Sequence, residues 1–127
     1  MNTAAAPAPI GPYNQAVFAG DFLFISGQVA LEPSTGAFLN ETVAQEAQQV
    51  MKNLEAILSN SGLGFQHVIK TTIFLSDMSL FAEVNQIYAG YFDAVSQGQN
   101  VYPARETVAV KGLPKDARVE ISMIAAR

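Results

Sequence analysis

Two charged side chains near the end of the sequence lie beside or within apolar segments. Arg105 follows residues 102–104, Tyr-Pro-Ala, just before one predicted strand, and Glu120 lies inside the next, 119–123. Strand interiors hold a charge mainly when another group pairs with it. An Arg guanidinium can hold a carboxylate through two parallel hydrogen bonds, and a nearby Glu can orient a water or accept a proton. The pair therefore indicates chemistry on a small carboxylic acid, with a purely structural ion pair as the alternative.

The composition limits the classes of protein and partner. The 127 residues fit one domain, 1–127, that is long enough to bury a core without metal or disulfide support. Half of the residues are hydrophobic and only 14% are charged, which is low for a monomer and indicates that another subunit covers part of the surface. The net charge of -4 disfavours nucleic acid and anionic membranes as partners.

Several kinds of site are excluded by the residue types. The sequence has no Cys, so disulfides, thiolate nucleophiles and Cys-based metal sites are absent. His67 is the only His, so we expect no transition-metal site, and we assign His67 no chemistry. Residues 1–9 lack the basic start and the apolar stretch of an export signal, and no segment has membrane-spanning length. We therefore expect a cytoplasmic protein.

Hydrophobic spacing predicts the first half of the fold. Residues 15–27 read as two short strands joined at Gly20, and 33–36 form a turn. Apolar residues recur every three to four positions through 42–61, which predicts a helix that Thr42 caps and Gly62 ends.

The second half follows the same reasoning. Residues 68–75 are rich in β-branched side chains and predict a central strand. A second helix begins after Asp77 or Ser79 and is followed by a polar loop, 96–100. Its apolar stripe is formed by Phe81, Val84, Tyr88 and Tyr91. Two final strands, near 106–110 and 118–125, flank a turn at 112–116.

This order predicts an α+β domain with both helices on one face of a mixed sheet. In the last strand, residues 119, 121, 123 and 125 would face the helices, and residues 120, 122, 124 and 126 would face solvent or another subunit. If the final strands form a hairpin around Pro114, Arg105 lies near Ile124, about four residues or roughly 13 Å from Glu120. The two side chains would then meet only across a subunit boundary.

Several motifs resemble, in order, those of the Rid (reactive intermediate deaminase) family, also called the YjgF family. They are Ile-Gly-Pro-Tyr-Asn-Gln at 10–15, Ile-Ser-Gly-Gln at 25–28, Pro-Ala-Arg at 103–105 and Val-Glu-Ile at 119–121. The resemblance implies a chorismate-mutase-like fold, assembled as a homotrimer with a central β-barrel and ligand clefts between subunits. It also implies cofactor-free hydrolysis of 2-imino acids, such as 2-iminopropanoate and 2-iminobutanoate, to 2-oxo acids and ammonia.

The resemblance assigns roles to individual residues. Arg105 would clamp the substrate carboxylate, and Glu120 would hold a water near the imine carbon, with an interface salt bridge as its alternative. Tyr13 would present its phenol to the substrate or simply pack after a Pro turn. Ser26 and Gly27 would bring a backbone amide close to the ligand, or merely end a strand.

Asn85 and Thr107 complete the predicted substrate-binding set. Asn85 matches a cleft position of the family, although a helical Asn is often only solvated. Thr107 stands where the deaminase branch often has Cys, and Glu106 lies between it and Arg105. Glu106 should project away from Arg105 in an extended strand. The 94–100 loop is also slightly longer than in the best-known members of the family. These departures affect substrate preference more than fold.

Two other functions compete with imine hydrolysis. A trimeric module with the same cleft could bind 2-oxo acids or related small carboxylates without turning them over. RNA cleavage, also attached to the family, finds little support in an acidic chain without a basic patch.

Overall fold

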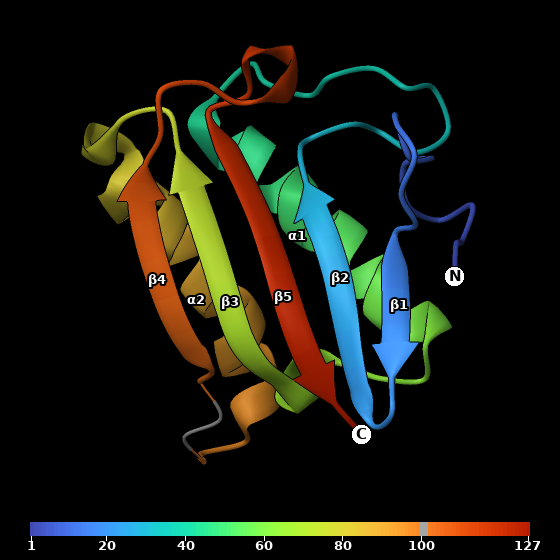
Figure 1. Cartoon of the computed structure of the whole chain (residues 1–127). Coiled ribbons are helices and arrows are strands. Elements are labelled where there is room, and N and C mark those ends of the chain that lie inside the picture. Colours follow the sequence, from blue (N-terminus) through green and yellow to red (C-terminus); the bar gives the residue numbers. More distant parts are fainter. Residues whose placement is uncertain (100–101) are drawn as a thin grey trace.

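The computed structural model contains one mixed sheet with both long helices on the same face (Figure 1). It describes residues 1–99 and 102–127, so Asn100, the end of the predicted 94–100 loop, lies outside the described residues. The strands are β1 (Ala16–Ala19), β2 (Phe22–Gln28), β3 (Val68–Leu75), β4 (Ala104–Ala109) and β5 (Val119–Ala126). The long helices are α1 (Val43–Asn60) and α2 (Phe81–Ser96), with short 3₁₀ turns η1 (Phe65–His67), η2 (Met78–Leu80) and η3 (Pro114–Asp116).

Local sequence signals set the ends of α1. The Thr42 side chain accepts a hydrogen bond from the backbone N–H of Gln45, and Gly62 adopts a positive φ of 76° after the last turn. Both predictions are confirmed. For α2, Asp77 caps the preceding turn η2 through the N–H of Ser79, so the predicted cap acts one turn earlier than expected. The helix continues to Ser96, where the predicted polar loop 96–100 begins, so residues 94 and 95 of the longer 94–100 loop belong to the helix.

The sheet order is β1-β2-β5-β3-β4, and only β3 and β4 run parallel. The predicted hairpin between the last two strands is therefore wrong. Because α2 connects β3 to β4, the chain makes a crossover that leaves β4 at the edge and parallel to β3. Residues 110–118 then carry the chain back over the end of β3, and β5 pairs with β2 and β3 in the centre.

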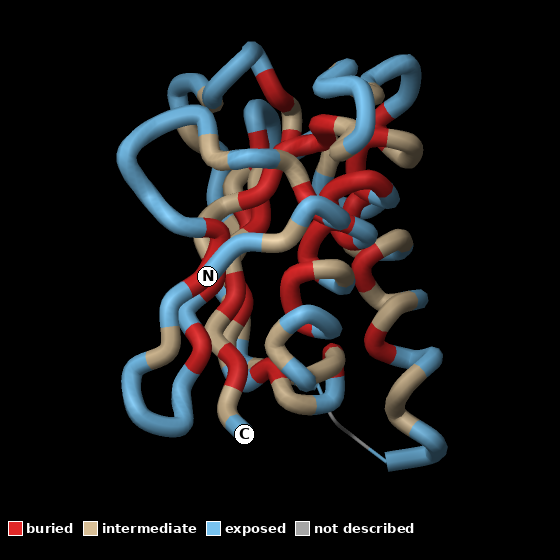
Figure 2. Tube along the Cα trace, turned by 90° about the vertical axis from the view of Figure 1, so that its right-hand side faces the viewer, coloured by how far each residue is buried: buried red, intermediate tan, exposed pale blue. Residues whose placement is uncertain are grey.

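The core lies between the sheet and the helices, where the buried segments of strands and helices face one another (Figure 2). On β5, Val119, Ile121, Met123 and Ala125 are buried, as the alternation predicted. No helix of residues 1–99 or 102–127 lies over the opposite face (Figure 1). This face carries half-exposed apolar side chains, among them Val17 (50% exposed), Phe24 (47%) and Val108 (45%). Apolar groups gathered on one face are typical of a surface that contacts another chain.

No helix in the described part of the chain is long and apolar enough to cross a membrane.

Candidate functional site

Arg105 lies inside β4, one residue after its start, and not before the strand as the sequence indicated. Its partner in the sheet is Thr71, a buried residue of β3 that itself faces Met123 on β5. Arg105 therefore projects from the helix-covered face, at the open edge of the sheet. The next residue, Glu106, projects the other way and its carboxylate lies 3.2 Å from the Lys70 ammonium, which confirms that it does not neutralise Arg105.

Two aromatic rings of α2 support the Arg105 guanidinium. Its central carbon lies 5.0 Å from the centre of the Tyr88 ring and 5.7 Å from that of Phe81. Such cation–π contacts attract the charge without using its N–H donors. The Tyr88 hydroxyl donates a 2.9 Å hydrogen bond to Thr71, which fixes the ring against the strand. Within residues 1–99 and 102–127, no carboxylate forms an ion pair with Arg105.

The Arg105 pocket is a hollow between α2 and the start of β4. It has a volume of about 280 Å³ and is lined by Asn85, Tyr88, Ala89, Tyr102, Pro103 and Arg105. This volume is close to the lower end of the range for small-molecule sites, about 300–1,000 Å³. The Tyr102 hydroxyl donates to the Asp93 carboxylate and ties this wall to α2. An anion can therefore reach the Arg105 donors between mainly apolar walls.

Asn85 and Thr107 lie on the same side of the sheet as Arg105. Asn85 lines the Arg105 pocket, so the structure brings together two of the predicted residues. The Thr107 hydroxyl oxygen is buried and has no hydrogen-bond partner among the described residues. It lies with Asn85 and Arg105 around a gap too small for water, beside Phe81 and Val84. A buried hydroxyl without a hydrogen bond destabilises the folded state. A polar ligand that entered the gap after a small movement of its walls would give the Thr107 hydroxyl a partner.

Glu120 lies on the opposite face of the sheet from Arg105. Its sheet partner is Phe74, which projects from the uncovered face and is itself opposite Val108 on β4. Arg105 and Glu120 are thus three residues apart along the strands, roughly 10 Å, and two strand spacings apart across the sheet, roughly another 10 Å. In one chain the two predicted catalytic groups do not meet. The prediction that they are separated is confirmed, although the hairpin from which it came is wrong.

The Glu120 corner consists of Glu120, Gly27, Ser26 and Tyr13. The pairing of β2 with β5 shifts between Ile25 and Gln28, and this irregularity places Gly27 against the Glu120 side chain. A Cβ atom on Gly27 would lie only 2.8 Å from Cδ of Glu120. Position 27 must therefore be a glycine for this contact, because the Glu120 carboxyl group occupies the space that a Cβ atom would take. Burial raises the pKa of Glu120 above its ordinary value of 4.5.

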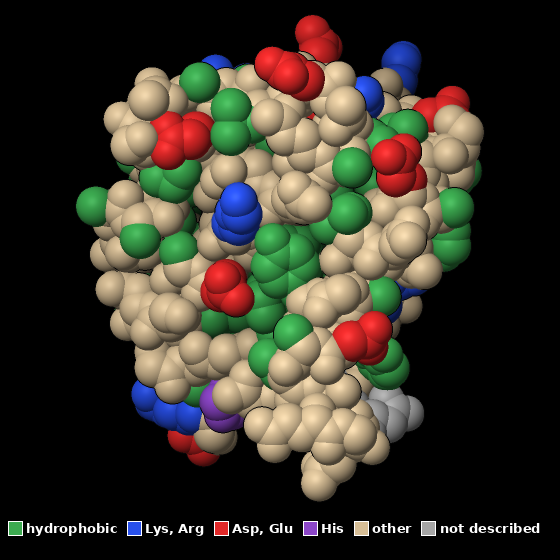
Figure 3. Space-filling view, turned by 180° about the vertical axis from the view of Figure 1, so that it is seen from behind, with side chains coloured by type: hydrophobic (Ala, Val, Ile, Leu, Met, Phe, Trp, Pro, Cys, Tyr) green, Lys and Arg blue, Asp and Glu red, His purple; other side chains and the backbone are tan. Residues whose placement is uncertain are grey.

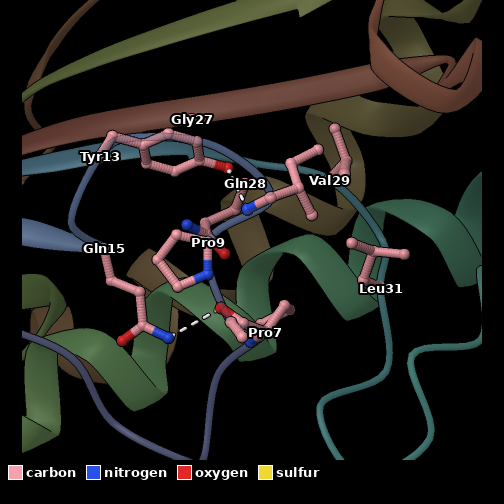
Figure 4. A pocket seen from close by; sticks show the side chains of 10 residues that line it. Pro7, Pro9, Tyr13, Gln15, Gly27, Gln28, Val29 and Leu31 are labelled. Atoms are coloured by element: carbon pink, nitrogen blue, oxygen red, sulfur yellow. Dashed lines mark hydrogen bonds between the residues drawn. The ribbon is translucent and has the colours of Figure 1, made fainter.

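An N-terminal strap, residues 3–15, carries Tyr13 to this corner. The side chain of Gln15 holds the strap: it accepts from the N–H of Thr3 and donates to the carbonyls of Thr3, Ala6 and Pro7. Figure 4 shows the Tyr13 ring beside Gly27 and Pro9, in a hollow that these residues line. The Tyr13 hydroxyl accepts a hydrogen bond from the N–H of Ile10 at 3.3 Å. Because the hydroxyl is the acceptor in this bond, its own O–H can donate to a ligand.

Ser26 joins the strap to β2. Its hydroxyl donates to the Asn14 carbonyl at 2.7 Å, and its N–H donates to the Gln15 carbonyl at 2.9 Å. Its donors are used within the chain, so a ligand would find only the lone pairs of the Ser26 oxygen. Ser26 therefore holds the strap in place, and its hydrogen-bond donors are not available to a ligand.

A family model described as Endoribonuclease L-PSP matches residues 3–127. A RutC family protein of Synechocystis is 50% identical over 126 residues, which cover 98% of this chain and 93% of the relative. The chain belongs to the Rid/YjgF family. The family resemblance drawn from the sequence motifs is therefore confirmed, and it extends over nearly the whole chain.

Two other Rid/YjgF relatives bear on the site. The 2-iminobutanoate/2-iminopropanoate deaminase of Mus musculus is 46% identical over 125 residues, which cover 98% of this chain and 88% of the relative. The crystal structure of Escherichia coli TdcF with bound serine has a TM-score of 0.91 and 39% identity, covering 98% of this chain and 95% of that one. The α+β fold predicted for this Rid/YjgF chain is confirmed.

Sequence reasoning missed the aromatic support of Arg105. The helical spacing places Tyr88 on the apolar stripe of the second helix, and Tyr88 is buried in the core, but the same ring also lies against the guanidinium. A signal was present: Phe81, Asn85 and Tyr88 follow one another at spacings of four and three on α2. Residues at these spacings share one helix face, so the predicted site residue Asn85 indicated both aromatic neighbours.

Proposed function

We propose that this chain hydrolyses 2-imino acids, such as 2-iminopropanoate and 2-iminobutanoate, to 2-oxo acids and ammonia. The observation that carries the proposal is the Arg105 guanidinium, which lines a pocket, stacks on Tyr88 and has no carboxylate partner in the described part of the chain. A cation held in this way suits the carboxylate of a small acid. The deaminase name of the mouse relative and the serine bound to TdcF support the same class of ligand.

We further propose a homotrimer in which Arg105 of one subunit and Glu120 of the next line one cleft. The uncovered sheet face, with its half-exposed Val17, Phe24 and Val108, would be buried by this assembly. The opposite orientation of Arg105 and Glu120 within one chain supports a site shared between chains. We expect the trimer to act in the cytoplasm.

The reaction needs water and one group that moves protons. With the carboxylate on Arg105, the imine carbon would face Glu120 of the neighbouring subunit. Ionised Glu120 takes a proton from water as the water oxygen bonds to the imine carbon, and it then gives this proton to the nitrogen, which becomes an amine. Transfer of the hydroxyl proton of this adduct to the nitrogen breaks the C–N bond, forms the carbonyl and releases ammonia. Fixed orientation and one acid–base group supply the catalysis, and no cofactor takes part.

A binding module for 2-oxo acids is the second candidate, because the Arg105 pocket lies within a single chain and does not include Glu120. RNA cleavage is less well supported, although the matching family model is described as an endoribonuclease. The chain carries a net charge of -4, and on the helix-covered face Lys and Arg are scattered among Asp and Glu (Figure 3).

The test is ammonia release from 2-iminobutanoate generated freshly in the cuvette, together with calorimetric binding of 2-oxobutanoate. Ammonia released faster than the spontaneous rate is the expected result. Tight binding of 2-oxobutanoate with no acceleration would favour the binding module. If neither is observed with protein whose native mass is that of a trimer, both proposals are wrong.

Gly27→Ala is expected to lower kcat about tenfold or more, because the new methyl group would displace the Glu120 carboxyl group from its place. Binding of 2-oxobutanoate should change by less than about twofold, since the carboxylate is held by Arg105 of the neighbouring subunit, whose donors do not depend on Gly27. Steady-state kinetics and calorimetry measure the two effects.

Gly90→Ala is the matched control. Gly90 lies on α2, and a Cβ atom there meets nothing within 4 Å. This variant should keep wild-type kcat. A Gly27→Ala variant with wild-type kcat would show that the position of the Glu120 carboxyl group does not limit the reaction.

A further inference from the structure

Helix α1 carries a buried carboxylate in contact with the start of β5. The Glu46 side chain has an exposed fraction of 0% and contacts the residues just before Glu120. Its Oε2 accepts the backbone N–H of Arg118 at 2.7 Å and that of Val119 at 3.3 Å. Its Oε1 accepts from Nε of Arg118 at 2.8 Å. A buried carboxylate with these partners fixes the backbone beside it closely.

Residues 29–31, which follow Gly27, are fixed to the same helix. Nδ2 of Asn53, two turns after Glu46, donates to the carbonyls of Val29 at 3.1 Å and Leu31 at 3.0 Å. The Asn53 side-chain oxygen accepts from Gln49, so its amide is oriented in one way only. The segment that follows Gly27 and the segment that precedes Glu120 are therefore both held by α1.

The tight contact between Gly27 and Glu120 depends on this common support. The space over Gly27 leaves no room for a methyl group, so a small shift of β5 against β2 would move the Glu120 carboxyl group. Asn53 fixes β2 through the two carbonyls after it, and Glu46 fixes β5 through the two N–H groups before Glu120. Arg118 also donates to the Asn40 carbonyl at 2.7 Å, so its guanidinium is held from a second side.

We propose that Glu46 is a positioning residue for the reaction: through the N–H groups of Arg118 and Val119 it sets the place of the Glu120 carboxyl group. This inference rests on the proposed imine hydrolysis. Glu46 itself is buried and does not touch substrate. Its loss should therefore reduce kcat while leaving carboxylate binding at Arg105 unchanged, which separates it from a residue of the pocket.

The test compares Glu46→Gln with Leu58→Ala, a variant of another fully buried α1 residue three turns away. Glu46→Gln is expected to lower kcat about tenfold with KM within about twofold, because an acid–base group loses its position. It should also speed amide hydrogen exchange at Arg118 and Val119, and bring the pKa of Glu120, followed by carboxyl-carbon NMR, back toward its ordinary value. Leu58→Ala should lower the melting temperature but keep wild-type kcat and the Glu120 titration.

A variant that fails to fold does not end the test, because Glu46→Asp keeps the charge and shortens the reach to the two N–H groups. It should show the same loss of kcat. Wild-type kcat and an unchanged Glu120 titration in folded Glu46 variants would overturn the inference. So would equal losses of kcat in Leu58→Ala. If the wild-type protein releases no ammonia, the proposed function fails, and the exchange and titration results still decide whether Glu46 positions Glu120.

Discussion

Replacing Arg105 with alanine is expected to lower kcat/KM for 2-iminobutanoate by about 10²–10⁴-fold. Two parallel hydrogen bonds to a carboxylate would be lost, and bonds to charged groups contribute about 1.5–3 kcal/mol each. Arg105→Lys should recover only part of the loss, because an ammonium lacks the planar fork that holds both oxygens. Steady-state kinetics on freshly generated imine, with calorimetry of 2-oxobutanoate, measures both losses.

Arg127 provides the matched control for Arg105. It is also an Arg stacked on an aromatic ring, with its central carbon 4.3 Å from the centre of the Phe18 ring, but it is exposed and paired with Asp21. Arg127→Ala should leave kcat/KM unchanged. An Arg105→Ala variant as active as Arg127→Ala would remove the observation on which the proposed function rests.

Local patterns were sufficient to predict the elements of the fold. The end signals of α1, the β-branched run of β3 and the alternation of β5 each depend on neighbouring residues, so they could be read directly. The order of the strands could not. The short connection of residues 110–118 looked like a hairpin turn, but pairing of β4 with β3 leaves β5 to fill the central position. Long-range pairing of this kind has no local signature.

The same distinction applies to the candidate site. Arg105 and Glu120 were identified because charged residues beside apolar segments are unusual, and Asn85, Tyr13 and Gly27 came from the family motifs. Their division between two faces of the sheet followed only from the register of β3 with its two neighbours.

The buried supports of the site gave no sequence signal. Glu46 occupies a position on α1 that the helical pattern alone does not distinguish from a solvated polar residue. Only its burial and its hydrogen bonds to the backbone before Glu120 reveal its role.

Glu120→Gln is expected to lower kcat by about 10²–10⁴-fold, because Gln keeps the shape of the side chain but cannot accept a proton from water. Binding at Arg105 should remain. Since burial raises the pKa of Glu120, the acid limb of kcat in the wild-type protein should lie above the ordinary value of 4.5. A pH profile of kcat measures this limb, which should vanish from any residual activity of the variant.

The stability of the folded chain should change with pH in a related way. A carboxyl group whose pKa is higher in the folded state favours folding while it is protonated, and that contribution is lost as pH rises through the folded pKa. Glu120→Gln is neutral at every pH and does not lose it. The free energy of unfolding of the variant minus that of wild type should therefore increase from pH 4 to pH 7, as measured by denaturant unfolding. An equal difference at both values would mean that Glu120 has an ordinary pKa.

Mixing the Arg105→Ala and Glu120→Gln variants tests whether the two residues act across a subunit boundary. Each variant alone should be nearly inactive. If the proteins are unfolded together and refolded as mixed trimers, a cleft that takes Arg105 from one chain and Glu120 from the next is intact in about one quarter of cases. Activity near that fraction of wild type is the expected result. No recovery in trimers shown to be mixed would mean that both residues serve from the same chain. Because Arg105 and Glu120 project from opposite faces of one sheet, that outcome would require a rearrangement of the fold.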